Sequence, residues 1–145
     1  MIGFEVSTRF ILNRDFDRII DIDCTSSGPY GWDAEDLFQE WKNGVGIVAV
    51  NSDDFPLGFC IYNLEGKQFF EIKHFSVDKS FQRSGIGTSL INKMKSKLHD
   101  RRGILSCNVP EENLSFQLFM KRMGFKATLI RHNFGDLLRF QYEKV

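Results

Sequence analysis

The spacing of apolar residues constrains the fold of this chain more than any other feature, because that spacing changes along the sequence. Residues 45–50, 57–64 and 69–77 form three apolar or alternating runs, separated by polar, turn-forming residues. Three such runs in succession predict an antiparallel meander. Residues on both sides of the meander follow helical spacing instead, so we expect one sheet with helices packed on it.

The helix after the meander is the best defined element of the sequence. From Ile86 to Leu98 apolar residues recur every three or four positions, lysines take the other faces, and Gly103 ends the helix. Residues 104–109 are apolar enough to predict a buried strand. Because a helix connects this strand to the run 69–77, the two strands must run parallel to each other.

Shorter patterns predict the remaining elements. They are a first strand at 4–10, a helix at 14–24 capped by Asn13, a short helix capped by Asp33, a last helix at 113–123, and strands near 125–130 and 137–142. The order is therefore βααβββαβαββ, with about seven strands and four helices in three layers, which is an α+β fold. No linker or repeat divides the chain, so residues 1–145 are expected to form a single domain.

Composition argues against several classes of protein. The chain carries 19 basic and 19 acidic side chains, so no overall charge draws it to nucleic acid or to an anionic membrane. No apolar stretch is long enough to span a bilayer. Cys24, Cys60 and Cys107 lie far apart without a C-x-x-C spacing, which argues against a zinc site or a disulfide framework. We expect a cytoplasmic protein that binds no metal, no nucleic acid and no membrane.

One turn of the sequence has the composition of an anion site. Residues 82–87, Gln-Arg-Ser-Gly-Ile-Gly, lie between the third strand of the meander and the next helix. A helix N-terminus exposes unpaired N–H groups with a partial positive charge, and Gly85 and Gly87 let a phosphate approach the backbone. The Gly-Lys-Ser/Thr of an ATP-binding loop is missing, and Leu90 occupies the third glycine position of a dinucleotide fingerprint. An ordinary glycine-containing turn is the alternative.

Two segments resemble one known family. Residues 82–87 resemble the Gln/Arg-x-x-Gly-x-Gly/Ala coenzyme A loop of the GNAT acetyltransferase superfamily. Residues 113–125 resemble that superfamily's Asn-x6-Tyr-x3-Gly-Phe segment, with Met120 in place of the tyrosine. The order of predicted elements is similar as well. Residues 29–32, Pro-Tyr-Gly-Trp, are similar to the Pro-Trp turn of ribosomal-protein N-terminal (alanine) acetyltransferases.

The resemblance implies a mixed, mostly antiparallel GNAT-like sheet whose parallel fourth and fifth strands splay apart to admit acetyl-CoA. Backbone N–H groups from Arg83 to Thr88 would bind the pyrophosphate, and the preceding strand would pair with the pantetheine arm. Asn113, which can also cap a helix, would hydrogen-bond that arm, and an N–H near Val77 would polarise the thioester carbonyl. The expected coenzyme-contacting residues are Phe75, Ser76, Val77, Gln82, Arg83, Ser84, Gly85, Ile86, Gly87, Thr88, Asn113, Phe119 and Met120.

The amine that attacks the thioester must be neutral. At pH 7 roughly 10% of an α-amino group but under about 0.1% of a lysine side chain is neutral, so a lysine acceptor needs a base more urgently. Glu71 precedes Gln82 by the spacing at which histone-type family members carry their base, and we expect it to be catalytic; a glutamate on a wet strand face is the alternative. His74 is a second candidate, on the opposite face unless a bulge intervenes. Tyr30 and Trp32 are expected to contact the acceptor.

Two positions depart from the family pattern. Asn108 stands where ribosomal-protein N-terminal acetyltransferases have a glutamate, and Met120 stands where the family has the tyrosine that protonates the leaving thiolate. Methionine cannot donate a proton, so catalysis is expected to use another donor or to be slower. Ser115, Tyr142 and Tyr30 are the candidate substitutes.

The sequence therefore predicts an acetyl-CoA-dependent N-acetyltransferase, monomeric or homodimeric, in which the primary amine of a protein N-terminus or lysine attacks the acetyl group directly. Small amines such as polyamines or antibiotics are the alternative acceptors. Met120 favours a second class, a catalytically weak acyl-CoA-binding sensor or interaction module. A protein-binding α/β domain without coenzyme is a third class, which leaves the glycine turn without a role.

Overall fold

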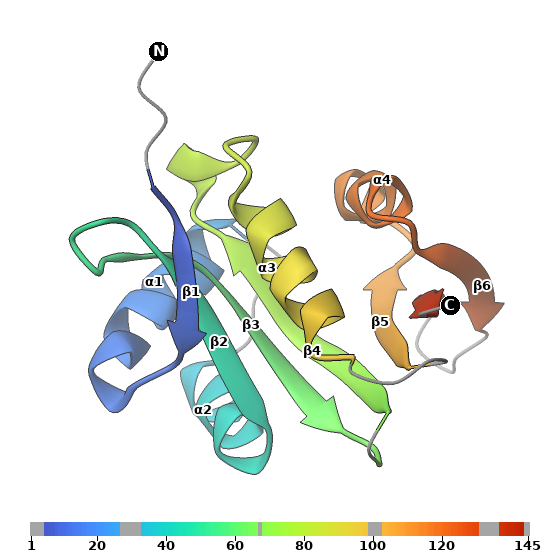
Figure 1. The fold of residues 1–145 in the computed structure, drawn as a ribbon, viewed down its shortest axis with the longest axis horizontal. Helices are drawn as coiled ribbons and strands as arrows, with labels where there is room; N and C mark the ends of the chain where they lie inside the picture. Colours follow the sequence, from blue (N-terminus) through green and yellow to red (C-terminus); the bar gives the residue numbers. More distant parts are fainter. Residues whose placement is uncertain (1–4, 27–32, 67, 99–102, 131–136, 144–145) are drawn as a thin grey trace.

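Seven strands form one mixed sheet in the order β1-β2-β3-β4-β5-β7-β6, in which β4 and β5 run parallel and the other neighbours are antiparallel (Figure 1). The computed structural model describes residues 5–26, 33–66, 68–98, 103–130 and 137–143. The elements are β1 (Ser7–Phe10), η1 (Asn13–Asp15), α1 (Phe16–Ser26), α2 (Ala34–Asn43), β2 (Val45–Val50), β3 (Pro56–Leu64), β4 (Phe69–Val77), η3 (Lys79–Phe81), α3 (Ile86–Ser96), β5 (Ile104–Pro110), α4 (Leu114–Arg122), β6 (Lys126–Ile130) and β7 (Leu137–Glu143).

The predicted order of helices and strands is confirmed, and so is the parallel pair. Asp33 caps α2 as predicted, because its Oδ1 accepts a hydrogen bond from the Glu35 amide at 2.8 Å. The prediction for Asn13 was wrong. Asn13 begins the 3-10 turn η1, and Leu12 takes the cap position, where its amide donates to the Asp15 carboxylate at 2.7 Å.

The sheet separates two apolar layers. On one face α3 and α4 pack through a core that contains Leu90, Met94 and Met120, with α3 crossing β3 and β4 in Figure 1. On the other face α1 and α2 pack through a core that contains Ile19 and Leu37. The helical spacing predicted the buried side of α3, since its apolar residues are almost completely covered. Strands β2 and β3 therefore contribute side chains to both cores, whereas the apolar side chains of β4 belong to the core under α3 and α4.

The described residues include no helix that is long and apolar enough to cross a bilayer. They also include no group of three His, Cys, Asp or Glu side chains that could hold a metal ion. Cys60 and Cys107 are buried free thiols, whereas Cys24 is exposed. Burial raises the pKa of both buried thiols, that of Cys107 to about 12, so they remain protonated and unreactive at neutral pH.

The parallel pairing of β4 with β5 is shorter than either strand. The ladder joins residues 69–72 of β4 to residues 104–107 of β5, but β4 continues to Val77 and β5 to Pro110. Both strands keep their outer partners over this stretch, β3 for β4 and β7 for β5. The two central strands therefore diverge beyond Ile72, which is the splay that the resemblance implied.

A bulge in β4 changes which of its side chains share a face. Ile61 of β3 pairs with His74 and Tyr62 pairs with Ile72, so Lys73 is an extra residue. Ile72 contacts the core under α3, whereas Ile61 belongs to the core under α1 and α2. After the bulge the even-numbered residues of β4 therefore change from the α3 face to the α1 and α2 face.

Candidate active site

The turn between β4 and α3 presents backbone amides to solvent. Gly85 is the N-cap of α3 with φ 86°, in the left-handed region that glycine adopts without strain. The first helical hydrogen bond runs from the Ser89 amide to Gly85 O at 3.0 Å, so the amides of Ile86, Gly87 and Thr88 have no acceptor within the helix. Aligned peptide dipoles give this end of α3 a partial positive charge. The arrangement suits an anion.

The residues before Gly85 hold a strained, exposed conformation. Arg83 has φ 65°, which costs a non-glycine residue roughly 1–2 kcal/mol. The turn is fixed by the Ser84 amide, which donates to Phe81 O at 3.3 Å, and by Gln82 Nε2, which donates to Val77 O at 3.3 Å. Residues 82–85 are nevertheless exposed. Strain retained in an accessible turn is typical of ligand-binding segments.

Close packing fixes α3 against the sheet just behind the turn. A Cβ on Gly58 of β3 would lie 3.0 Å from Ile86 Cγ2, 3.0 Å from Ser76 O and 3.3 Å from Leu90 Cδ1. Glycine at this position therefore lets the first turn of α3 approach β3 closely. The Ile86 side chain is only 1% exposed, so of this residue the backbone amide alone can face a ligand.

The splayed part of β4 offers a second set of backbone groups. Successive peptide groups of a strand point alternately to its two sides, so part of those in residues 73–77 face away from β3. In that stretch the parallel ladder to β5 has ended. An extended ligand arm can pair with such an edge as an additional strand would. This edge leads directly into the turn that follows Val77.

An aromatic cluster covers the splay on the α3 and α4 face. Phe75 of β4 lies 5.4 Å from Phe116 and 5.7 Å from Phe119, both on α4, measured between ring centroids. A Cβ on Gly87 would lie 3.2 Å from the Phe119 ring, so α4 packs directly on the first turn of α3. Met120, the other expected coenzyme contact on α4, is fully buried in the core instead. Phe116 was missed from the sequence, although its spacing of three from Phe119 places both on one helix face.

Polar contacts fix the start of α4 at the end of β5. Asn113 caps α4, with Oδ1 accepting from the Phe116 amide at 3.4 Å, which is the structural role foreseen for it. The buried Gln117 donates from Nε2 to Pro110 O at 3.2 Å and to Glu111 O at 2.7 Å. These hydrogen bonds fix the start of α4 to the end of β5. Gln117 is a second residue that the sequence reasoning missed.

The bulge in β4 brings the two candidate bases to the same face. Glu71 pairs with Asn63 and His74 pairs with Ile61, on the side of the sheet that carries α1 and α2. The expectation that a regular strand would place them on opposite faces is corrected by the extra residue Lys73. The Glu71 side chain is 14% exposed, and its Oε1 lies 3.3 Å from Lys73 Nζ. Glu71 is therefore largely buried, and its charge is partly balanced by Lys73.

His74 is electrostatically unlike Glu71. Burial lowers the pKa of His74 to about 4; the Asp23 carboxylate on α1 opposes this shift, and Lys73 adds to it. The imidazole is only 5% exposed. It is therefore neutral at physiological pH and a weak base.

A row of polar residues crosses the sheet at the level of Glu71. Its cross-strand neighbours are Asn63 on β3 and Ser106 on β5, and Ser106 in turn pairs with Gln141 on β7. Paired side chains on one face lie roughly 5 Å apart at Cβ, so the row is continuous. The other three residues of this row were not predicted, because cross-strand register has no local signal in the sequence.

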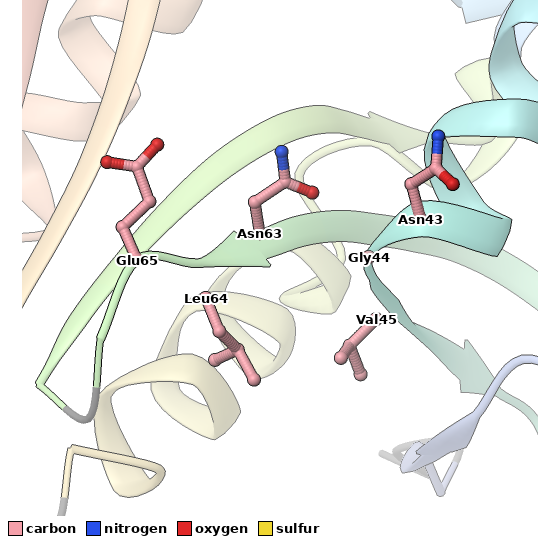
Figure 2. A pocket seen from close by; sticks show the side chains of 6 residues that line it. All are labelled: Asn43, Gly44, Val45, Asn63, Leu64 and Glu65. Carbon is pink, nitrogen blue, oxygen red and sulfur yellow. The ribbon is translucent and has the colours of Figure 1, made fainter.

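A separate open pocket of about 440 Å³ lies between the start of β2 and the end of β3. Figure 2 shows the polar ends of Asn43, Asn63 and Glu65 on one side of it and Leu64 and Val45 on the other. Asn63 Oδ1 is buried and has no hydrogen-bond partner among the described residues. The pocket lies at the opposite end of β3 from Gly58, so it is distinct from the turn at α3.

The model of the acetyltransferase (GNAT) family matches residues 15–125, which include the whole of the meander, the turn and α4. This chain belongs to that family. An uncharacterized N-acetyltransferase of Methanocaldococcus jannaschii is 34% identical to it over 102 residues, which are 66% of this chain and 44% of that protein. The GNAT chain thus spans less than half the length of this relative.

Solved structures resemble this GNAT chain over nearly its whole length. The ribosomal-protein-S18-alanine N-acetyltransferase of Escherichia coli is 16% identical with a TM-score of 0.81, covering 96% of this chain and 94% of that one. Arabidopsis thaliana NAA60 in complex with a bisubstrate analogue is 20% identical with a TM-score of 0.75, covering 97% and 98%. At these identities the likeness shows the fold, and it confirms the predicted GNAT architecture.

The residues of this GNAT chain that were predicted to contact the acceptor or to donate a proton do not lie together. Tyr30 and Trp32 lie outside the described residues. Ser115 is exposed on the first turn of α4, with Oγ 3.4 Å from Asn113 Oδ1. Tyr142 lies under Lys95 Nζ, 4.2 Å from the ring centre, near the far end of α3. Nine residues of α3 separate Lys95 from the turn, about 13 Å along the helix axis.

Proposed function

We propose that this GNAT protein transfers the acetyl group of acetyl-CoA to a primary amine, at a protein N-terminus or on a lysine. The observation that carries the proposal is the junction of the amides at the start of α3 with the stretch of β4 that lies beyond its ladder with β5. The free amides of Ile86, Gly87 and Thr88 suit a pyrophosphate, and the splayed edge of β4 that leads into them suits an extended arm. An ordinary glycine turn does not account for this combination.

Different residues of this chain would then bind the coenzyme and carry out the transfer. Residues 83–88 hold the pyrophosphate through backbone N–H groups, Phe119 packs beside it at Gly87, and β4 aligns the pantetheine arm. An N–H of β4 at the Ile72 end of the splay donates a hydrogen bond to the thioester oxygen as the amine attacks, because six residues, roughly 20 Å of strand, separate Val77 from Glu71. Glu71, on the face of the sheet that carries α1 and α2, accepts the proton of the attacking amine.

The leaving thiolate requires a proton from a group other than Met120. Ser115 is favoured over Tyr142, because its hydroxyl is exposed at the end of α4 next to the splay, whereas Tyr142 lies near the other end of α3. A thiolate is a good enough leaving group that a water molecule can also supply the proton. The full burial of Met120 supports a packing role for this residue.

The structural neighbours include acetyltransferases for both kinds of acceptor, an alanine N-acetyltransferase of a ribosomal protein and a structure described as a phosphinothricin N-acetyltransferase. The first of the two has the higher TM-score, 0.81 against 0.77. We therefore propose the protein N-terminus as the first acceptor to test and lysine as the second, with polyamines as the small-molecule comparison.

The first experiment measures thermal stability with acetyl-CoA. Ligand at 100 times its dissociation constant should stabilise the native protein by about 2.7 kcal/mol and raise the melting temperature. Gly85→Ala and Gly66→Ala form a matched pair, because both glycines have φ near 90° and neither added methyl group meets an atom within 4 Å. Both variants should lose roughly 1–2 kcal/mol of stability, but Gly85→Ala alone should lose most of the stabilisation by acetyl-CoA. An unchanged melting temperature of the wild type would contradict the proposal.

Thiol release then separates an enzyme from a sensor. Peptides with free N-termini, N-terminally blocked peptides that carry lysine, and spermidine are offered with saturating acetyl-CoA. Faster release of free coenzyme A with one of these classes identifies the acceptor. Stabilisation by acetyl-CoA without release above hydrolysis for any acceptor would favour the acyl-CoA-binding module.

A further inference from the structure

Arg18 on α1 contacts the segment that precedes the turn at α3, although α1 and α3 pack on opposite faces of the sheet. Its Nη2 forms an ion pair with Asp78, the first residue after β4. Its Nε donates to Pro56 O at 3.0 Å, and its guanidinium carbon lies 4.4 Å from the centre of the Phe55 ring. Both charged side chains are largely buried, at 20% and 15% exposure. The guanidinium is therefore fixed in orientation on three sides.

Asp78 connects Arg18 to the turn through its own hydrogen bonds. Its second carboxylate oxygen accepts from the Ser80 amide at 2.8 Å and so caps η3. Its backbone N–H donates to Leu57 O at 2.8 Å, and its carbonyl accepts from the Phe81 amide at 2.8 Å. Phe81 O in turn accepts from the Ser84 amide. An unbroken series of hydrogen bonds thus leads from Arg18 to the residue before Gly85.

The charges on this pair strengthen the contact. Burial alone would raise the pKa of Asp78, but the hydrogen bonds from Arg18 and from the Ser80 amide outweigh it and hold that pKa below its ordinary value. The Asp78 carboxylate is thus ionised at neutral pH. Lys79, Ser80 and residues 82–84 are exposed, whereas Phe81 packs against the core under α3. A conformation as strained as that of Arg83 requires support from outside the turn.

We propose that Arg18 is a positioning residue of the coenzyme site, which holds residues 79–84 in the conformation that presents the amides of α3. The inference rests on the proposed function, because it takes coenzyme A as the ligand of the turn. Arg18 itself touches neither the coenzyme nor the amine. Its loss should therefore weaken coenzyme binding and leave the chemical step of the loaded enzyme almost unchanged.

The experiment measures binding of coenzyme A by calorimetry and the kinetic constants for acetyl-CoA. In Arg18→Ala and in Asp78→Asn, which keeps an oxygen for the Ser80 amide, the dissociation constant and KM should rise about tenfold, while kcat stays within about twofold. Arg18→Lys keeps the charge but not the forked geometry and should fall between. Arg14→Ala is the matched control, since it removes an exposed arginine of the same segment that pairs with Asp54; its binding should equal that of the wild type.

The outcomes separate the two proposals. A wild type that does not bind coenzyme A overturns the proposed function. A wild type that binds, with Arg18→Ala and Asp78→Asn binding equally tightly, overturns the positioning role alone, as does a fall in kcat at unchanged KM. If Arg18→Ala does not fold, Asp78→Asn and Arg18→Lys decide the matter on the same criteria.

Discussion

At the scale of single residues, the site depends on where Glu71 lies relative to the attacking amine. Replacement by glutamine keeps the size of the side chain and removes its ability to accept a proton. We expect Glu71→Gln to lower the acetylation rate about hundredfold at pH 7 but much less at pH 9, where a larger share of the amine is already neutral. Initial rates at both pH values test this, with Glu143→Gln on β7 as a control. An equal loss at pH 7 and pH 9 would contradict a role as general base.

His74 leads to a prediction about stability. Its pKa is about 4 in the folded protein and about 6.5 when exposed, so the unfolded chain binds more protons between these values. Stability contributed by the neutral imidazole is complete above about pH 6.5 and is lost as the pH falls toward 4, by up to about 3 kcal/mol. Urea unfolding at pH 7 and pH 5 should show this loss in the wild type and a smaller one in His74→Gln. Identical pH dependence would show that another group titrates.

Sequence reasoning reached some of these residues and missed others for physical reasons. Glu71 and the glycine turn belong to continuous segments whose spacing is visible in one stretch of chain. The bulge at Lys73 is not visible there, because it exists only in the register between β4 and β3. Asn63 and Ser106 become neighbours of Glu71 through the same long-range pairing. Met120 fits the family pattern by position, yet its burial depends on how α4 packs.

At the scale of elements, the contact of α3 with β3 at Gly58 positions the turn. We expect Gly58→Ala to lower the free energy of unfolding by roughly 1–3 kcal/mol, because the added methyl group would press on Ile86 and on the backbone of Ser76. Acetyl-CoA should also bind more weakly, since the first turn of α3 must move. Chemical denaturation and calorimetry measure the two effects. A variant as stable as the wild type would show that α3 is free to shift.

The elements themselves were largely predictable. Strands β2 and β4 and helix α3 carry long apolar patterns, and their bounds depend on those patterns more than on distant contacts. The start of a helix is less visible in the sequence. Helix α1 begins after a 3-10 turn because the Asp15 carboxylate accepts a hydrogen bond from the Leu12 amide, and this contact competes with capping by Asn13. The splay of β4 from β5 has no periodic signal, since both strands continue past the point where their pairing ends.

At the scale of the whole molecule, β1 to β4 with α1 to α3 form one part and β5 to β7 with α4 form the other (Figure 1). The parts are joined by four paired residues on each central strand, by the apolar core that α3 and α4 share, by the aromatic contacts of Phe75 and by the Lys95 contacts with Met123 and Tyr142. The predicted order of elements could not indicate how short the ladder between the two central strands is. A ligand bound along the splay would touch both parts.

The position of β7 within the sheet has a consequence for how the protein is made. It is the last of the seven strands along the chain, yet it pairs with β5 on one side and β6 on the other. Neither β5 nor β6 can therefore complete its pairing on the ribosome until residues 137–143 have emerged, while the meander can close much earlier. During synthesis, the half-finished sheet therefore passes through an interval in which one edge of β5 has no partner strand, and such an edge can pair with another chain.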